Sequence, residues 1–236
     1  MGEQAAARVR LVTTGVTTFA LIPGAGGAAS YWHRVLPLLE AAGHEALAVG
    51  LPGADERAGL PEYADVVTSA IGDRRDVVIV AQSLGGFTAA MVATRVPVRE
   101  LVFVNAMIPN PGETPGAWWD NTGAVDARVA AAQTGGYAEE FDPFVYFLHD
   151  IPPGVLAEGD ADGGVEADAV FGCACEFDGW PDVPKRVLVG SNDRFFPPEF
   201  QRVVARDRLG VDVDLLPGGH LIALAQPTFV AEYLLR

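Results

Sequence analysis

The chain has 236 residues, half of them hydrophobic and a fifth charged, and this composition allows one large globular α/β domain. Its formal net charge of -15, with only 16 Lys and Arg residues, argues against a nucleic-acid partner and against binding to anionic membranes. Residues 1–8 lack the apolar core of a secretory signal, and no apolar run approaches the roughly 18 residues of a membrane helix. We therefore expect a cytoplasmic protein.

Short β-rich runs alternate with amphipathic stretches along most of the chain. Strands are predicted at residues 16–22, 45–49, 77–81, 101–105, 186–190 and 211–215. Helices are predicted at residues 31–42, 61–71, 84–95, 198–208 and 221–235. This order predicts an α/β fold with a mostly parallel central sheet and helices on both faces. The apolar runs 77–81 and 101–105 contain no polar alternation, which is typical of strands buried on both sides.

Residues 111–183 interrupt this alternation. They are rich in Gly, Pro and Asp and carry several large aromatic side chains: Trp118, Trp119, Phe141, Phe144, Tyr146 and Phe147. We interpret the segment as a mostly helical cap inserted between two parts of the core domain, residues 1–110 and 184–236. The aromatic rings either line a pocket beneath the cap or form the hydrophobic interior of the cap itself.

The most informative stretch is residues 77–86, V-V-I-V-A-Q-S-L-G-G, in which an apolar strand runs into a turn of small residues around Ser83. It differs by one residue from the G-x-S-x-G nucleophile elbow, because Ala81 replaces the first glycine. In that motif a sharp turn from strand to helix raises a serine hydroxyl above the sheet, and small neighbours prevent clashes. The pattern predicts Ser83 as a nucleophile; an ordinary strand–helix junction is the alternative.

A serine hydroxyl is a weak nucleophile unless a neighbouring base takes its proton. Four histidines are available: His33, His44, His149 and His220. Of these, His220 follows Gly-Gly directly after the last predicted strand, and Asp193 lies at the carboxyl end of the strand before it. The order Ser83, Asp193, His220 is that of a known Ser-Asp-His triad, so we expect these three residues to form one.

The remaining polar candidates are weaker. Asn105 also ends a strand, but an amide cannot stabilise an imidazolium as a carboxylate does. We expect His33 to be a half-buried helix residue, and His44 and His149 to be structural or solvated. Cys173 and Cys175 form a C-x-C that cannot complete a four-ligand zinc site, so we expect reduced thiols without a catalytic part, and neither a metal nor a cofactor.

Acyl transfer also requires donors that face the oxyanion of the tetrahedral intermediate. The backbone N–H groups of Leu84 and Ala25 are predicted for this role, with Gly24 and Gly26 allowing a close backbone approach. The same loop, Gly24-x-Gly26-x-x-Ala29 with Glu45 further on, also fits a dinucleotide-binding fingerprint. That alternative leaves Ser83 and the Gly-Gly-His segment unexplained, and Pro23 interrupts its strand-to-glycine junction.

Together these motifs resemble those of the α/β-hydrolase superfamily, in its small esterase branch that includes plant methyl esterases and hydroxynitrile lyases. The matching segments are residues 23–27 followed by Tyr31-Trp32, then 50–53, 82–86, 190–193 and 218–220. The resemblance implies an α/β-hydrolase fold with a cap. Two departures matter: Pro23 stands where family members often carry His, and the cap lysine used by the lyases has no counterpart, because the only lysine, Lys185, precedes the 186–190 strand.

The leading hypothesis is a cofactor-independent serine hydrolase that cleaves a small-to-medium apolar carboxylic ester through an acyl-enzyme on Ser83. A small-molecule ester is the only partner expected. The candidate pocket side chains are Trp32, Trp118, Trp119 and Phe144. Two alternatives stay open: the same triad used for lactone opening, C–C bond hydrolysis or perhydrolysis, and a ligand-binding protein with a pocket but little turnover.

Overall fold

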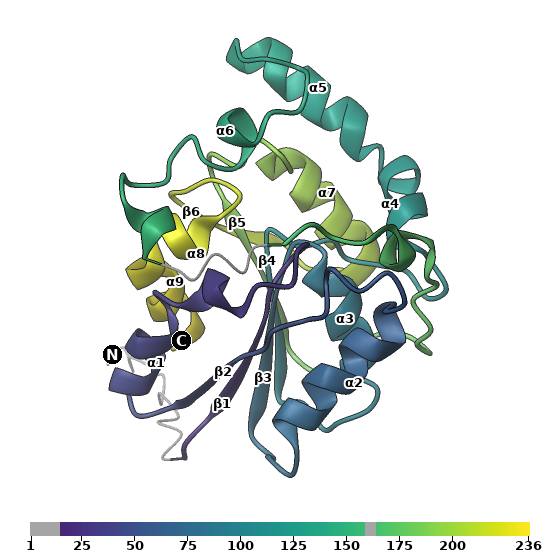
Figure 1. Ribbon diagram of the computed structural model, residues 1–236, viewed down its shortest axis with the longest axis vertical. Helices are drawn as coiled ribbons and strands as arrows, with labels where there is room; N and C mark the ends of the chain where they lie inside the picture. The colour runs from purple at the N-terminus through teal and green to yellow at the C-terminus, as the bar shows by residue number, and fades with distance from the viewer. Residues whose placement is uncertain (1–14, 159–163) are drawn as a thin grey trace, which may run out of the picture.

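The computed structural model describes residues 15–158 and 164–236 (Figure 1). Residues 1–8, where no secretory signal is predicted, lie outside the described residues, as does the part of the predicted cap at 159–163. Six parallel strands form one sheet in the order β2-β1-β3-β4-β5-β6. They are β1 (Thr18–Ile22), β2 (Glu45–Ala48), β3 (Val77–Gln82), β4 (Glu100–Val104), β5 (Lys185–Gly190) and β6 (Val213–Leu216). The predicted parallel sheet is confirmed.

The central strands are buried on both faces, as their apolar runs predict. In β3, Val77, Ile79 and Ala81 join one hydrophobic cluster, whereas Val78 and Val80 join the other. The first cluster is completed by side chains of α2 (Leu60–Ile71), α3 (Gly85–Val92) and α7 (Pro198–Leu209). The second is completed by α1 (Leu36–Ala41), α8 (Ile222–Ala225) and α9 (Pro227–Leu234). Helices therefore cover both faces of the sheet.

Two predicted helices are interrupted, and a proline accounts for the position of each new start. The predicted helix 31–42 is a 3₁₀ turn, η1 (Ala29–Trp32), followed by α1 with Pro37 in its first turn. The predicted helix 221–235 divides into α8 and α9, and Pro227 begins the second. Proline has no N–H to donate inside a helix, but it fits the first turn, where that donor has no partner.

The segment between β4 and β5 contains most of the remaining helical structure. It comprises α4 (Pro115–Thr122), α5 (Ala124–Gly135), α6 (Pro143–Tyr146), and the 3₁₀ turns η2 (Val155–Ala157) and η3 (Asp168–Gly172). Figure 1 shows α5 and α6 beyond the carboxyl ends of the strands. We call residues 111–183 the cap segment. Its base is tied to α7 by the buried ion pair of Glu113 and Arg208.

The turn from β3 into α3 depends on close backbone approaches. The Ser83 carbonyl accepts hydrogen bonds from Gly86 N–H at 3.1 Å and Met107 N–H at 2.9 Å. A Cβ added to Gly24 would lie 2.8 Å from the Ser83 Cβ, and one added to Gly86 would collide with the Met107 carbonyl oxygen. Glycine at these positions therefore allows three segments to meet around Ser83.

This packing predicts that Gly86→Ala lowers the free energy of unfolding by about 1–3 kcal/mol, because the extra methyl group forces backbone movement in a filled core. Urea denaturation followed by circular dichroism measures the effect. Gly172→Ala is the matched control, since a Cβ there meets no atom within 4 Å. Equal denaturation midpoints for the two variants would contradict the packing argument.

Candidate active site

Ser83 lies between β3 and α3 in a backbone conformation that non-glycine residues rarely adopt. Its φ is +48°, in the left-handed region, and the residue is 9% exposed. Such strain persists only where the surrounding structure determines the backbone. The contacts of Gly24, Gly86 and Met107 supply that constraint.

The three residues of the predicted triad lie within hydrogen-bonding distance of one another. His220 Nδ1 is 2.9 Å from Asp193 Oδ2, and His220 Nε2 is 3.2 Å from Ser83 Oγ. Because a carboxylate can only accept, a neutral imidazole carries its proton on Nδ1 and presents the Nε2 lone pair to the serine hydroxyl. Asp193 and His220 are 3% and 1% exposed, so bulk water does not compete for these bonds.

Asp193 is held by three donors besides the imidazole. Its Oδ1 accepts from the backbone N–H groups of Phe195 and Phe196 at 2.8 and 2.9 Å. Its Oδ2 accepts from Gln201 Nε2 on α7 at 3.1 Å. These bonds compensate the burial of a carboxylate and fix its orientation toward His220. The sequence pattern did not single out Gln201, although its place on the helix directly after Asp193 was a usable signal.

Asn105, the alternative strand-end residue, serves the loop that carries His220. It is fully buried, with φ at +47°, and its Nδ2 donates to the carbonyls of Gly219 and His220 at 2.9 Å each. Its Oδ1 accepts from Gly190 N–H at 2.8 Å. An amide both donates and accepts, so one side chain ties β4 to the end of β5 and to the loop after β6.

Aromatic rings surround the His220 imidazole. Phe147 of the cap segment stacks on it, with ring centroids 5.0 Å apart and an interplanar angle of 21°. Phe195 and Phe196 meet the same ring edge-on, at 5.0 and 5.2 Å. None of these three was among the predicted pocket residues. Their position next to Asp193 in the sequence could have identified Phe195 and Phe196, whereas nothing in the sequence distinguished Phe147 from other cap aromatics.

His149 and Asp150 support the same loop from the cap segment. Asp150 Oδ2 accepts a hydrogen bond from Gly219 N–H at 2.5 Å. The His149 ring packs so closely that a Cβ on Gly219 would lie 2.8 Å from its Cε1. Burial lowers the pKa of His149, and nearby Arg194 lowers it further, so the neutral form is favoured. A neutral His149 ring thus packs against the backbone of Gly219, next to His220.

The two predicted oxyanion donors belong to two segments that meet at Ser83. Leu84 follows Ser83 in the chain, and Gly24, next to Ala25, lies so close to Ser83 that an added Cβ would be 2.8 Å from the Ser83 Cβ. No residue in the described parts of the chain accepts a hydrogen bond from either the Leu84 or the Ala25 N–H. The neighbouring Gly26 N–H, in contrast, donates to Glu166 Oε2 at 2.5 Å. The sequence did not indicate Glu166.

The four predicted pocket residues lie in three different environments rather than around one cavity. Trp32 is fully buried in the cluster beneath α1 and α9. Trp118 and Trp119 pack against Phe196, at 5.2 and 5.6 Å between ring centroids. Phe144 is 74% exposed on α6. A hydrophobic residue type does not distinguish core, pocket and surface, so the sequence could not separate these positions.

Dinucleotide binding would depend on Glu45, and the lyase reaction on a lysine, for which Lys185 is the only candidate. Both residues lie at the amino-terminal edge of the sheet, opposite the candidate triad. Glu45 is the first residue of β2 and is bound by Arg74 and Thr18. Lys185 is the first residue of β5, and its Nζ donates to the carbonyls of Pro181 and Val183. The glycine loop, residues 23–27, follows the carboxyl end of β1, so neither side chain faces it.

Three further observations concern metals, thiols and membranes. Among the described residues, no group of three or more His, Cys, Asp or Glu side chains is arranged to hold a metal ion. Cys173 and Cys175 are free thiols, and burial raises the pKa of Cys175 to about 12. None of the helices at 15–158 and 164–236 combines the length and apolarity that crossing a bilayer requires.

Comparison with known proteins agrees with this architecture. The chain is 33% identical to methylesterase 3 of Arabidopsis thaliana over 113 residues, covering 42% of this chain and 43% of that protein. It is 32% identical to an alpha-hydroxynitrile lyase of the same plant over 109 residues, covering 41% and 42%. The matches thus span less than half the length of these curated relatives.

The solved structures extend the likeness to nearly the whole chain. A pyrethroid hydrolase from Sphingobium faniae JZ-2 superposes with a TM-score of 0.72 at 21% identity, covering 94% of this chain and 96% of that one. At that identity the superposition shows the fold. The model of the alpha/beta hydrolase family matches residues 19–233. The resemblance inferred from the motifs is confirmed, and the chain belongs to the alpha/beta hydrolase family.

Proposed function

We propose that this protein is a serine hydrolase that cleaves a small-to-medium apolar carboxylic ester through an acyl-enzyme on Ser83. The observation that carries the proposal is the hydrogen-bond chain from Ser83 Oγ through His220 to Asp193. The names of relatives, among them methylesterase 3, support an ester as the substrate class. No cofactor is needed for this chemistry.

In the proposed acylation, Ser83 Oγ attacks the ester carbonyl carbon while His220 Nε2 takes the hydroxyl proton. Asp193 holds the imidazole in the required tautomer and stabilises the cation that forms. The carbonyl oxygen becomes an oxyanion that accepts hydrogen bonds from the Leu84 and Ala25 N–H groups. The ester C–O bond then breaks, and His220 returns the proton to the leaving alcohol.

Deacylation repeats these steps with water as the nucleophile. His220 Nε2 takes a proton from water, and the resulting hydroxide adds to the acyl carbon of the Ser83 ester. The tetrahedral intermediate collapses with release of the carboxylic acid, and the proton on His220 returns to Ser83 Oγ. Each proton is therefore carried by the same nitrogen, which the structure holds 3.2 Å from Ser83 Oγ.

The aromatic surroundings of His220 fit both the mechanism and the substrate class. An imidazolium stacked on a phenyl face, as with Phe147, gains a cation–π interaction that neutral imidazole lacks. The rings of Phe195 and Phe196 reduce access of water from the side. An apolar acyl or alkyl group is better matched to such walls than an ionic one. Lyase chemistry that relies on a cap lysine is disfavoured, because Lys185 lies at the start of β5.

Replacing the proposed nucleophile gives the direct test. Ser83→Ala should lower kcat for p-nitrophenyl acetate by about 10,000-fold or more, because the covalent route is lost. A fluorophosphonate should label the wild-type protein at Ser83 and leave the variant unlabelled, as read by mass spectrometry. Ser69→Ala, an exposed serine on α2, is the control. Unchanged turnover in Ser83→Ala would rule out the mechanism.

The acid is tested by an isosteric change. Asp193→Asn should lower kcat by about 10,000-fold with little change in KM, since an amide favours the wrong tautomer of His220. Circular dichroism should show a retained fold. Asp182→Asn is the matched control, because Asp182 is an exposed residue near the end of the cap segment. A variant retaining a tenth of the wild-type kcat would show that Asp193 is not the acid.

The stacked ring is tested in the same assay. Phe147→Leu should lower kcat about 2- to 30-fold, corresponding to a cation–π contribution of about 0.5–2 kcal/mol in the transition state. The comparison is Phe229→Leu on α9, whose ring is 43% exposed. If KM rises while kcat stays the same, Phe147 contacts substrate instead of supporting the imidazolium.

A further inference from the structure

The glycine loop, residues 23–27, is held from outside the sheet by one carboxylate. Gly26 N–H donates to Glu166 Oε2 at 2.5 Å, although 140 positions separate the two residues. The other oxygen of the same carboxylate accepts a hydrogen bond from the Tyr63 hydroxyl of α2. Glu166, which belongs to the cap segment, therefore bridges the loop after β1 and a helix of the core.

Backbone contacts bring the cap segment to this loop at a further point. Ala167 N–H donates to the Gly53 carbonyl at 2.7 Å, and Leu51 N–H donates to the Gly27 carbonyl at 2.9 Å. Gly53 lies so close to the loop that an added Cβ would be 2.8 Å from the carbonyl carbon of Gly26 and 3.1 Å from Glu166 Oε2. The loop is thus enclosed between residues 51–53 and the cap segment.

Hydrogen bonding within the loop determines which amide it offers to a substrate. Gly27 N–H donates to the Gly24 carbonyl at 3.1 Å, and Gly26 N–H is occupied by Glu166. The Ala25 N–H, in contrast, has no acceptor in the described parts of the chain, although both following amides of the loop are bonded. Fixing Gly26 therefore fixes the peptide plane next to the proposed oxyanion donor.

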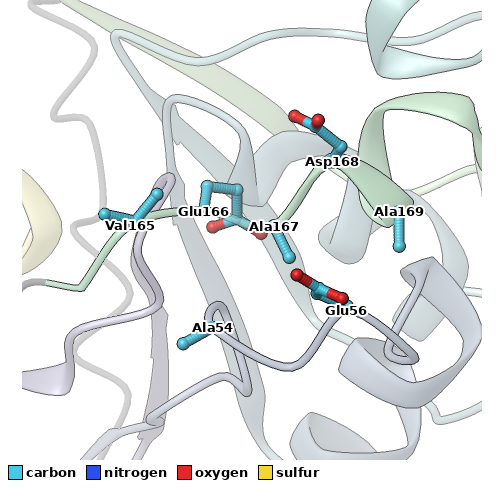
Figure 2. Close-up of a pocket in the computed structure, with 7 residues that line it drawn as sticks. All are labelled: Ala54, Glu56, Val165, Glu166, Ala167, Asp168 and Ala169. Atoms are coloured by element: carbon cyan, nitrogen blue, oxygen red, sulfur yellow. The ribbon is translucent and has the colours of Figure 1, made fainter.

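Glu166 lies at a surface pocket of about 620 Å³, with Glu56 and Asp168 on the same lining (Figure 2). Burial raises the pKa of the Glu166 carboxyl, and the bonds from Tyr63 and Gly26 offset only part of that increase. Of the three carboxylates of Glu56, Glu166 and Asp168, only that of Glu166 accepts a hydrogen bond from the glycine loop within the described parts of the chain. Glu166 is half-buried and has two donors, whereas Asp168 is exposed.

We infer that Glu166 is a positioning residue: its hydrogen bond to Gly26 orients the glycine loop so that Ala25 N–H faces the oxyanion of the tetrahedral intermediate. This inference rests on the proposed function and extends it, because it makes a residue of the cap segment a determinant of the rate of acyl transfer. A donor aimed at the oxyanion acts in the transition state and hardly at all in the ground state.

The test compares Glu166→Ala and Glu166→Gln with Asp168→Ala, which removes the same charge from the same pocket. With p-nitrophenyl acetate, Glu166→Ala should lower kcat roughly 10- to 100-fold while KM changes less than about twofold, since a displacement of about 1 Å can cost 100-fold. Glu166→Gln should restore most of the rate, because its amide oxygen still accepts from Gly26 N–H. Equal kcat in Glu166→Ala and Asp168→Ala, or a raised KM alone, would overturn the inference.

A second readout does not depend on turnover. Hydrogen–deuterium exchange of the peptide covering residues 20–30 should be about tenfold faster in Glu166→Ala and unchanged in Asp168→Ala. If the wild-type protein hydrolyses no ester, the proposed function fails, while exchange still tests how the loop is held. Tyr63→Phe removes only the second bond and should cause a smaller acceleration, which covers the case that Glu166→Ala does not fold. Unchanged exchange in the folded variants would refute the inference.

Discussion

The His220 ring is almost completely enclosed, and an enclosed imidazole has two nitrogens that each cost free energy unless the protein supplies a partner. Asp193 is the partner of one nitrogen and Ser83 of the other. Satisfying the buried ring and aligning the proposed proton relay are therefore a single arrangement. Asp193 is held in turn by two backbone N–H groups and by Gln201, so the orientation of the imidazole follows from bonds made deeper in the protein.

The parallel sheet makes this arrangement possible because its strands end at a common edge. Ser83 follows β3, and Asn105 follows the adjacent β4; these are the two non-glycine residues with positive φ in the described parts of the chain. Both sit above strands that are buried on both faces, so tight packing below can hold an unfavourable backbone conformation. Asn105 then binds Gly190 at the end of β5 and the carbonyls of Gly219 and His220, so one side chain joins the ends of two strands to the loop after β6.

Three residues of the cap segment contact the loops that carry the candidate site. Phe147 stacks on the imidazole, Asp150 binds the N–H next to His220, and Glu166 binds the glycine loop. The first two contacts join the cap segment to the loop after β6, and the third joins it to the loop after β1. A change in the cap segment would therefore alter the alignment of the proposed catalytic groups as well as the shape of any cavity beside them.

Local sequence patterns predicted the strands and helices of the core, since burial on two faces and the strand-to-helix turn at Ser83 leave a signal in consecutive residues. They also predicted that Ser83, Asp193 and His220 would meet, because strand ends in a parallel sheet converge. The helix starts beside Pro37 and at Pro227 were not predicted, because apolar periodicity continues across both prolines.

The fold class and the three residues of the proposed relay could therefore be predicted from patterns in consecutive residues. The side chains that support them are visible only in the folded chain: Asn105, Phe147, Asp150, Glu166 and Gln201. The fold also places Trp32 in the core and Phe144 on the surface. Such contacts join residues that are far apart in the chain. Glu166 and Gly26 are 140 positions apart, and a hydrogen bond between them leaves no periodic pattern near either residue.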